Sequence, residues 1–481
     1  MDINFLTILL IVNILLAGVL IFIEKRDVAA TWAWLMILLF IPILGFLLYL
    51  FLGRQLKQKN FYHLSNKERS YLQLAVTDQA NKISNDQSFC RQDKLLSKHS
   101  HLIMMNLKSA NALLTTENEI QTFSDGHQKF NSLFRDIQLA KKEINIQYYI
   151  IQRDSLGKRL RDELTKKAEE GVKVRVLYDD IGSKRITPSF FKELVKHGGE
   201  VKAFFPSFLR LINFRLNNRN HRKLCIIDGR IAYIGGFNVG EEYLGIDRKF
   251  GYWRDTHFRI KGESVNQIQG RFILDWQQAT KQNLHIIEEF AFNNDENIGS
   301  TPIQIVASGP NSETEHLKNM YVKLIMSAKK SIYIQTPYFI PDASIMDACK
   351  IAILSGIDVR LMIPSKPDHP FVYWATLSYA GELLSYGAKI LLYENGFLHA
   401  KTIVVDQEVA SVGTTNIDTR SFKLNFEINA IVYSEKEASE LQNFFLFDSK
   451  HSRELTLETY QERAIFIRIK EAISRLLSPI L

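Results

Sequence analysis

The sequence predicts an α/β protein in which two similar sheet-and-helix halves form one body behind an N-terminal hairpin of two transmembrane helices. Three observations support this prediction. Apolar strand-like runs alternate with helical runs, two long uncharged apolar runs stand near the N-terminus, and blocks from the first half of the chain return in the second.

The two uncharged apolar runs are residues 3–23 and 28–53. Each is long enough to cross a hydrocarbon layer of about 30 Å as a helix, so within a membrane segment 1–55 we expect transmembrane helices over about 3–23 and 29–52. Three basic residues follow the second run, and the positive-inside rule therefore places the rest of the chain in the cytoplasm. A cleaved signal peptide is the weaker interpretation, because no basic residue precedes the first run.

The remaining sequence has the composition of a folded protein with a large core. Hydrophobic residues make up 46% of the chain, which excludes intrinsic disorder as its main state. The formal net charge of +8 favours an anionic membrane surface or a polyanion as its neighbour. Residues 56–115 are polar and poor in aromatics, and we interpret them as a connector; the two halves then occupy 116–300 and 301–481.

Internal repeats define these halves. Residues 140–147 are echoed 188 positions later by 328–335, in both cases a helix end that runs into an alternating strand. A glycine helix stop followed by a strand, at 171–176, is likewise echoed at 356–361. Two similar halves in one chain predict a pseudo-twofold pair.

A short motif with polar side chains also occurs once in each half. Its internal spacing is the same in both copies, which lie 178 residues apart, so chance duplication is improbable. We expect its glycines to let a ligand approach the backbone and its asparagines to donate hydrogen bonds to an anion. The copies comprise His221, Lys223, Asp228, Gly235 and Asn238 in the first half, and His399, Lys401, Asp406, Gly413 and Asn416 in the second.

The repeated motif predicts a phosphodiester site shared by the halves. Side chains alternate along a strand, so the histidine and lysine of each copy share a face, whereas Asp228 and Asp406 lie opposite and fix the strand ends as turn formers. One imidazole attacks phosphorus and the other protonates the leaving alcohol, while lysine and asparagine hold the non-bridging oxygens. We expect no metal and no cofactor, since no Asp, Glu or Cys stands at zinc-like spacing beside either histidine.

Each imidazole also needs a group that holds its other nitrogen. Two carboxylates in short β-like runs are the candidates, since Asp255 follows His221 by 34 residues and Glu427 follows His399 by 28. The sequence thus pairs each histidine with the carboxylate of its own half. The alternative is that both are ordinary edge carboxylates.

At these residues the sequence resembles the phospholipase D superfamily, whose signature is a pair of HKD motifs. The Thr31-Trp32-Ala33-Trp34 run, Pro42 and the ending 475–481 are similar to the bacterial cardiolipin synthases of that superfamily. The resemblance implies that two phosphatidylglycerols are joined into cardiolipin, with release of glycerol, through a phosphohistidine intermediate at the cell membrane. It implies His221 as the nucleophile and His399 as the acid and base, and pseudo-symmetry leaves the reverse assignment open.

Other functions remain alternatives at this stage. A membrane-bound phospholipase D, or a phosphatidyltransferase that uses another alcohol, needs the same motif. A nuclease has no need of two spans, and a catalytically dead scaffold is disfavoured because each motif keeps its histidine and lysine. We therefore expect phosphatidylglycerol and cardiolipin as partners and no nucleic acid, while the sequence does not indicate the oligomeric state.

Helical spacing of apolar residues returns near the C-terminus, interspersed with basic residues. It predicts an amphipathic helix that docks on the body or lies on the membrane, with docking slightly favoured. The apolar positions are Ile465, Ile469, Ile473, Leu476 and Ile480. Aromatic residues at 204–216 and 371–374 line a route for acyl chains or pack in the core.

Overall fold

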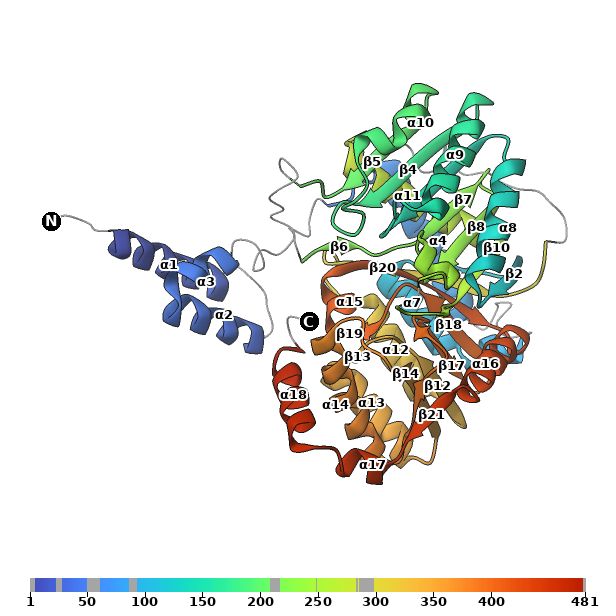
Figure 1. Cartoon of the computed structure of the whole chain (residues 1–481). Coiled ribbons are helices and arrows are strands. Elements are labelled where there is room, and N and C mark those ends of the chain that lie inside the picture. The colour runs from blue at the N-terminus through green and yellow to red at the C-terminus, as the bar shows by residue number, and fades with distance from the viewer. Residues whose placement is uncertain are drawn as a thin grey trace.

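The computed structural model describes residues 5–22, 28–49, 61–85, 93–207, 217–247, 249–282, 284 and 298–478. Its body consists of two halves, each a mixed sheet with flanking helices, drawn one above the other in Figure 1. The predicted α/β architecture with two similar halves is confirmed.

The first half contains a seven-stranded sheet. Its last three strands in spatial order are parallel, and the others pair antiparallel. The strands in spatial order are β2 (Asn118–Phe123), β10 (His257–Gly262), β8 (Ile231–Gly235), β7 (Leu224–Ile227), β3 (Glu143–Tyr148), β4 (Lys173–Asp179) and β5 (Glu200–Phe204). Its helices are α8 (Gly126–Leu139), α9 (Ser155–Glu169), η3 (Pro188–Phe191), α10 (Lys192–Lys196), η4 (Glu241–Leu244) and α11 (Ser264–Thr280).

The second half contains a ten-stranded sheet with a similar central order. Its main path runs through β1 (Leu114–Thr115), β11 (Ile303–Ser308), β20 (Asn425–Tyr433), β18 (Val409–Gly413), β17 (Thr402–Val405), β12 (Ser331–Gln335), β14 (Asp358–Pro364), β15 (Lys389–Tyr393) and β21 (Ser452–Leu455). The flanking helices are α12 (His316–Ser327), α13 (Ala343–Leu354), α14 (Pro370–Tyr386), α15 (Thr419–Lys423) and α16 (Glu435–Ser449), and β13 (Phe339–Ile340) pairs with β19 (Ile417–Asp418).

Local sequence explains these elements, as α9 illustrates. The Asp154 side chain accepts the backbone N–H of Gly157 and caps the helix N-terminus. Leu156, Leu160 and Leu164 recur at a spacing of four and are all buried. Gly171, at φ 85°, then ends the helical region and the chain turns into β4, as the sequence predicts.

Apolar side chains form a core in each half and a third core between the sheets. The third core joins residues of β7, β8 and β10 to residues of β11, β18 and β20. Helix α11 contributes Phe272 and Trp276 to it and contacts β5, β7 and β11. The two halves therefore share a buried apolar interface, which fixes their relative position.

The N-terminal region differs from the predicted hairpin of two spans. It forms α1 (Phe5–Phe22), α2 (Val28–Phe40) and α3 (Pro42–Leu48). Proline disfavours helical geometry in the preceding residue, and Ile41 accordingly lies at φ −129° and ψ 64°, so the run expected at 29–52 is not one continuous helix. Within the ranges described, no helix combines the length and the apolar character that crossing a membrane requires. The two expected spans are therefore not confirmed.

The connector expected at 56–115 includes helices α4 (Asn66–Ser84), α6 (Lys94–Lys98) and α7 (Ser100–Ala110). Helix α4 begins with a capping box between Ser65 and Glu68. The Gln79 side chain exchanges two hydrogen bonds with the backbone of Leu114, and α7 packs on α12 and β11. This segment thus belongs to the outer layer of the second half.

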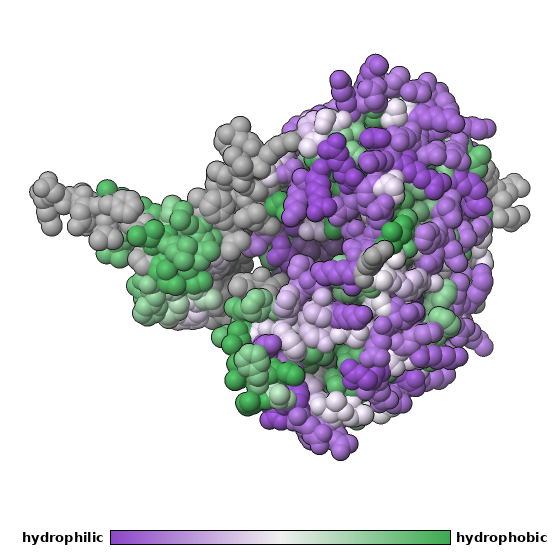
Figure 2. Space-filling view, viewed as in Figure 1, coloured by the Kyte–Doolittle hydropathy of each residue, from purple (hydrophilic) through white to green (hydrophobic). Residues whose placement is uncertain are grey.

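The chain closes with helices α17 (Leu457–Gln461) and α18 (Ile465–Leu476). Helix α18 packs on α14, where Arg475 pairs with Glu382, and Glu471 pairs with Arg463 in the turn before α18. Docking on the body is thereby confirmed. The apolar stripe is nevertheless exposed, at Ile465, Phe466, Ile469, Ile473 and Leu476. Figure 2 shows apolar surface here on the same side of the body as the N-terminal helices.

Candidate active site at the boundary between the halves

Two short strands cross from one half to the other immediately before the motif histidines. Strand β6 (Arg219–Asn220) pairs with β20 of the second half, and β16 (Phe397–Leu398) pairs with β9 (Trp253–Arg254) of the first. The backbone N–H of His221 donates to the carbonyl of Phe426 at 3.0 Å, and that of His399 to the carbonyl of Arg254 at 2.7 Å. Each histidine is therefore anchored to a strand of the other half.

This exchange corrects the expected pairing of histidines and carboxylates. Nδ1 of His221 lies 2.9 Å from Glu427, and Nδ1 of His399 lies 2.5 Å from Asp255. The prediction that each carboxylate serves its own half is wrong, because β6 and β16 bring each histidine to a strand of the other half. Both carboxylates are fully buried, and each occupies Nδ1, so Nε2 of either imidazole is the nitrogen left for a substrate.

The motif lysines converge on the same place. Lys223 and Lys401 are buried, and each ammonium donates to the backbone carbonyl of the histidine two residues earlier. The charges of Lys223 and Lys401 act on each other as well as on both carboxylates. The two copies of the motif therefore form one cluster, as the sequence predicts.

Desolvation and the paired positive charges determine the pKa values of this cluster. Burial, opposed by Glu427, lowers the pKa of His221, and burial together with Lys401 lowers that of His399 to about 4. Burial also lowers the pKa of Lys223 to about 7 and that of Lys401 to about 8. An anion between these groups would favour their charged forms, so the cluster is suited to a substrate with a negative charge.

The motif aspartates lie away from the histidines and organise the backbone. Asp228 accepts the backbone N–H groups of Lys141, Lys142 and Glu143, which precede and begin β3. Asp406 accepts the equivalent three N–H groups before β12. Both aspartates adopt a left-handed conformation, at φ 54° and 56°, which Asp tolerates better than most residues. Their expected role in fixing strand ends is confirmed.

The motif glycines allow other groups of the protein to approach the backbone closely. The expectation that they admit a ligand there is therefore wrong. A Cβ at Gly235 would lie 2.4 Å from the Thr256 carbonyl oxygen, and one at Gly413 would lie 2.2 Å from Asn429 Oδ1. At the next position the copies differ, because Gly236 leaves space for the Asp255 carboxylate whereas Thr414 donates its hydroxyl to Glu427.

The motif asparagines are likewise built into the fold. Asn238 accepts the backbone N–H of Ile150 at 3.1 Å and donates to the Tyr243 hydroxyl at 2.8 Å, while its side chain is buried. Asn416 is also buried, and its Oδ1 has no hydrogen-bond partner within the described ranges. Their role toward an anion stays a prediction.

Sequence reasoning missed a buried polar cluster that supports the first motif. Arg222, the middle residue of that motif, donates to Asp275 of α11 at 2.6 Å, and Asp275 also accepts the Tyr62 hydroxyl at 2.5 Å. Arg222 further donates to the backbone carbonyls of Glu427 and Ser308. The only signal in the sequence is the charge at the middle position, where the second copy has alanine.

Aromatic rings also flank both imidazoles. The Tyr149 ring centroid lies 4.9 Å from that of His221, and Trp253 lies 5.2 Å from His399. Together these contacts enclose two imidazoles and two ammonium groups in a largely buried site, which suits nucleophilic attack at phosphorus followed by proton transfer. No grouping of His, Cys, Asp and Glu with metal-site geometry occurs in the parts of the chain that the structure describes.

Family models match both the two-half body and the N-terminal segment of the chain. A model described as "Cardiolipin synthase, PLD-like domain" matches residues 133–276 and 321–448, and one described as "Phospholipase_D-nuclease N-terminal" matches residues 5–54. The first match covers both copies of the motif and both exchanged carboxylates. The second coincides with the N-terminal helices.

Relatives with curated names match nearly end to end. The chain is 52% identical to a cardiolipin synthase of Listeria welshimeri and 53% identical to the major cardiolipin synthase ClsA of Bacillus subtilis, over 99% of this chain and 98% of each relative. Among solved structures, a phosphatidylserine synthase of Haemophilus influenzae superposes with a TM-score of 0.62 at 15% identity, covering 80% of this chain and 100% of that one. That structural likeness establishes the shared fold.

Proposed function

Since this chain belongs to the cardiolipin synthase family of phospholipase D-like proteins, we propose that it joins two phosphatidylglycerols into cardiolipin and releases glycerol. The observation that carries the proposal is the single cluster at the boundary, where two histidine–carboxylate pairs and two lysines from both halves meet. Transfer between two alcohols requires one covalent carrier and one acid–base group, and the cluster supplies an imidazole for each.

In the first step, Nε2 of His221 attacks the phosphorus of one phosphatidylglycerol. The bond from phosphorus to the headgroup oxygen breaks, and the His399 imidazolium gives its proton to that oxygen, so glycerol leaves. Lys223 and Lys401 hold the non-bridging oxygens, whose negative charge is most concentrated in the transition state. Glu427 stabilises the positive charge that His221 gains on attack.

The second step reverses the first with a different alcohol. Neutral His399 takes a proton from a glycerol hydroxyl of the second phosphatidylglycerol, and that oxygen attacks phosphorus. The phosphorus–nitrogen bond breaks, which frees His221 and releases cardiolipin. The first step exchanges a phosphorus–oxygen bond for a phosphorus–nitrogen bond and the second step exchanges it back, so the two steps together conserve the number of phosphodiester bonds and the overall exchange is reversible.

The location of substrate and product places this chemistry at the cell membrane. Both lipids stay in the bilayer, so a tethered enzyme reaches them by diffusion along the surface. We propose that residues 1–55 anchor the chain with two spans and that the body faces the cytoplasm, as the basic residues after the second apolar run indicate.

Product analysis tests the proposal against hydrolysis by a phospholipase D. The purified full-length protein is incubated with labelled phosphatidylglycerol as its sole lipid, and the lipid and water-soluble products are identified. Equal amounts of cardiolipin and glycerol are expected, and neither is expected from His221→Ala or His399→Ala. Phosphatidic acid with little cardiolipin would show that water is the acceptor and would overturn the proposal.

A further inference from the structure

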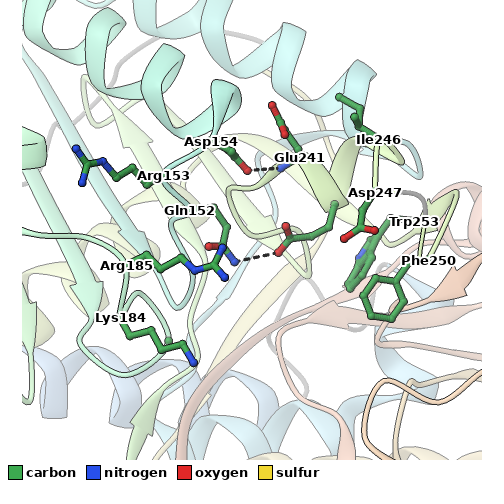
Figure 3. Close-up of a pocket in the computed structure, with 12 residues that line it drawn as sticks. Gln152, Arg153, Asp154, Lys184, Arg185, Glu241, Ile246, Asp247, Phe250 and Trp253 are labelled. Atoms are coloured by element: carbon green, nitrogen blue, oxygen red, sulfur yellow. Dashed lines mark hydrogen bonds between the residues drawn. The ribbon is translucent and has the colours of Figure 1, made fainter.

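A cavity of about 520 Å³ (Figure 3) includes in its lining Trp253, which neighbours His399 of the boundary site. It is lined by loops that follow β3 and β4, and by the segment from η4 to β9. Because β3 and β4 are parallel, their following loops lie at the same edge of the sheet. The cavity falls within the size range of pockets that bind small ligands, about 300–1,000 Å³.

Trp253 connects this cavity to the reacting groups. Its indole lines the cavity and lies 5.2 Å from the His399 ring, centroid to centroid. The side chain is 7% exposed, and its Nε1 has no hydrogen-bond partner in the described part of the chain. A buried indole N–H usually finds an acceptor, so this donor is available to a ligand oxygen next to His399.

Positive groups of the cavity are free, whereas its carboxylates are mostly engaged. Arg153, Lys184 and Arg185 are exposed and form no ion pair or hydrogen bond with the described residues. By contrast, Asp154 caps α9, and Glu241 accepts from the backbone and hydroxyl of Ser155.

Two further carboxylates suit a polyol. Glu242 is half-buried beside Gln152, whose amide approaches it at 3.4 Å, and burial raises its pKa. Asp247 accepts the backbone N–H of Lys249 and also lines the cavity. Hydroxyl groups donate to such oxygens, while the free guanidinium and ammonium groups match a phosphate.

We propose that this cavity binds the headgroup of the acceptor lipid, with its glycerol hydroxyls toward Trp253 and Glu242 and its own phosphate toward Arg153, Lys184 and Arg185. The inference rests on the proposed function and extends it by assigning a subsite. The acceptor alcohol must reach the group that removes its proton, which is His399 in the second step. Free glycerol lacks a phosphate, so the three basic residues favour a glycerophosphate ester over glycerol or water.

The test compares two acceptors in the full-length protein. Cardiolipin formation in phosphatidylglycerol vesicles uses a lipid acceptor, whereas incorporation of labelled glycerol into phosphatidylglycerol uses a free alcohol and the same covalent intermediate. In the variant Arg153→Gln/Lys184→Gln/Arg185→Gln, we expect the ratio of cardiolipin formation to glycerol incorporation to fall by about 10- to 100-fold, since charge-assisted contacts to phosphate are lost.

A matched variant controls for net charge. Lys166→Gln/Lys192→Gln/Lys202→Gln removes three exposed positive charges from the same half outside the cavity, and we expect the ratio to be unchanged. An unchanged ratio in the cavity variant, or an equal fall in the control, would overturn the subsite. The proposed function fails separately, if the wild-type protein forms no cardiolipin from phosphatidylglycerol.

Discussion

At the scale of single residues, the two imidazoles are oriented by carboxylates from opposite halves. A His–carboxylate contact fixes the imidazole tautomer and stabilises its charged form. Because β6 and β16 cross the boundary, neither half contains a complete histidine–carboxylate pair. Because of these crossed pairs, the chemistry depends on how the two halves are positioned relative to each other.

The crossed pairing predicts which imidazole responds to each acid. Glu427 raises the pKa of His221, and Asp255 raises that of His399, so neutralising an acid lowers the pKa of its partner. We expect Glu427→Gln to lower the pKa of His221 and Asp255→Asn to lower that of His399, each measured by NMR titration of labelled imidazoles. A change in the histidine of the same half instead would contradict the pairing.

The lysines predict a shift in the acidic limb of the pH–rate profile. Lys401 helps to lower the pKa of both histidines, so removing its charge raises both values. Attack requires a neutral nucleophile, and activity is lost once that imidazole is protonated. Lys401→Gln should therefore lower the rate by about 10²–10³, as for a lost oxyanion donor, and move the acidic limb to higher pH.

A charge-conserving variant separates this electrostatic effect from damage to the site. In Lys401→Arg the positive charge remains, so the acidic limb should keep its position whatever the loss in rate. An acidic limb that stays in place in Lys401→Gln, or moves to lower pH, would refute the electrostatic argument.

Much of the site follows from the sequence at this scale, and its limits have a physical cause. Strand alternation correctly places Asp228 and Asp406 away from the histidines. Spacing along the chain could not reveal that Glu427 contacts His221. Strand β6 has only two residues, and so short a run shows no alternation of apolar and polar side chains from which its partner strand could be predicted. The prediction that the motif glycines admit a ligand is wrong, because the groups that approach Gly235 and Gly413 belong to neighbouring protein segments.

At the scale of elements, α18 combines a docked face with an exposed apolar stripe. Its basic residues Arg468 and Lys470 stand beside that stripe, as in helices that lie at a membrane surface. Ile473 is 51% exposed and Leu476 is 81% exposed. The sequence predicted either docking or membrane contact, and the structure shows docking through one face of α18 while its apolar stripe stays exposed.

Membrane contact by α18 predicts a local change in polarity. An environment-sensitive fluorophore attached at Ile473→Cys, in a Cys90→Ser background, should shift to shorter wavelength on vesicles of phosphatidylglycerol and be quenched by brominated lipids. The matched position is Phe447→Cys on α16, also exposed but on another side of the body in Figure 1. Equal responses at both positions would show that α18 does not face the lipid.

The buried ion pair between Arg222, just before β7, and Asp275 of α11 predicts an effect on stability. In Asp275→Asn the Arg222 guanidinium loses its counter-charge in a fully buried place, which costs about 3–5 kcal/mol of folding free energy. We expect a clear fall in melting temperature. Asp162→Asn, which breaks an exposed pair with Arg161, should change it little, and similar shifts in both variants would contradict the assignment.

At the scale of the whole molecule, two homologous halves share one core and one site. Internal repeats in the sequence were enough to predict the halves, because each copy keeps its own sheet pattern. How the halves face each other was not predictable, since the third core is drawn from many short apolar runs that look alike. At Ile41, by contrast, a single residue decides the outcome, because Pro42 interrupts the helix that the continuous apolar run predicts.

Trapping the covalent intermediate tests transfer through a phosphohistidine most directly. The full-length protein is mixed with phosphatidylglycerol labelled at phosphorus, quenched within the first turnover and mapped for acid-labile, base-stable label. Label is expected on His221 in the wild-type protein and none is expected in His221→Ala. Cardiolipin formation without label on either motif histidine would contradict transfer through a phosphohistidine.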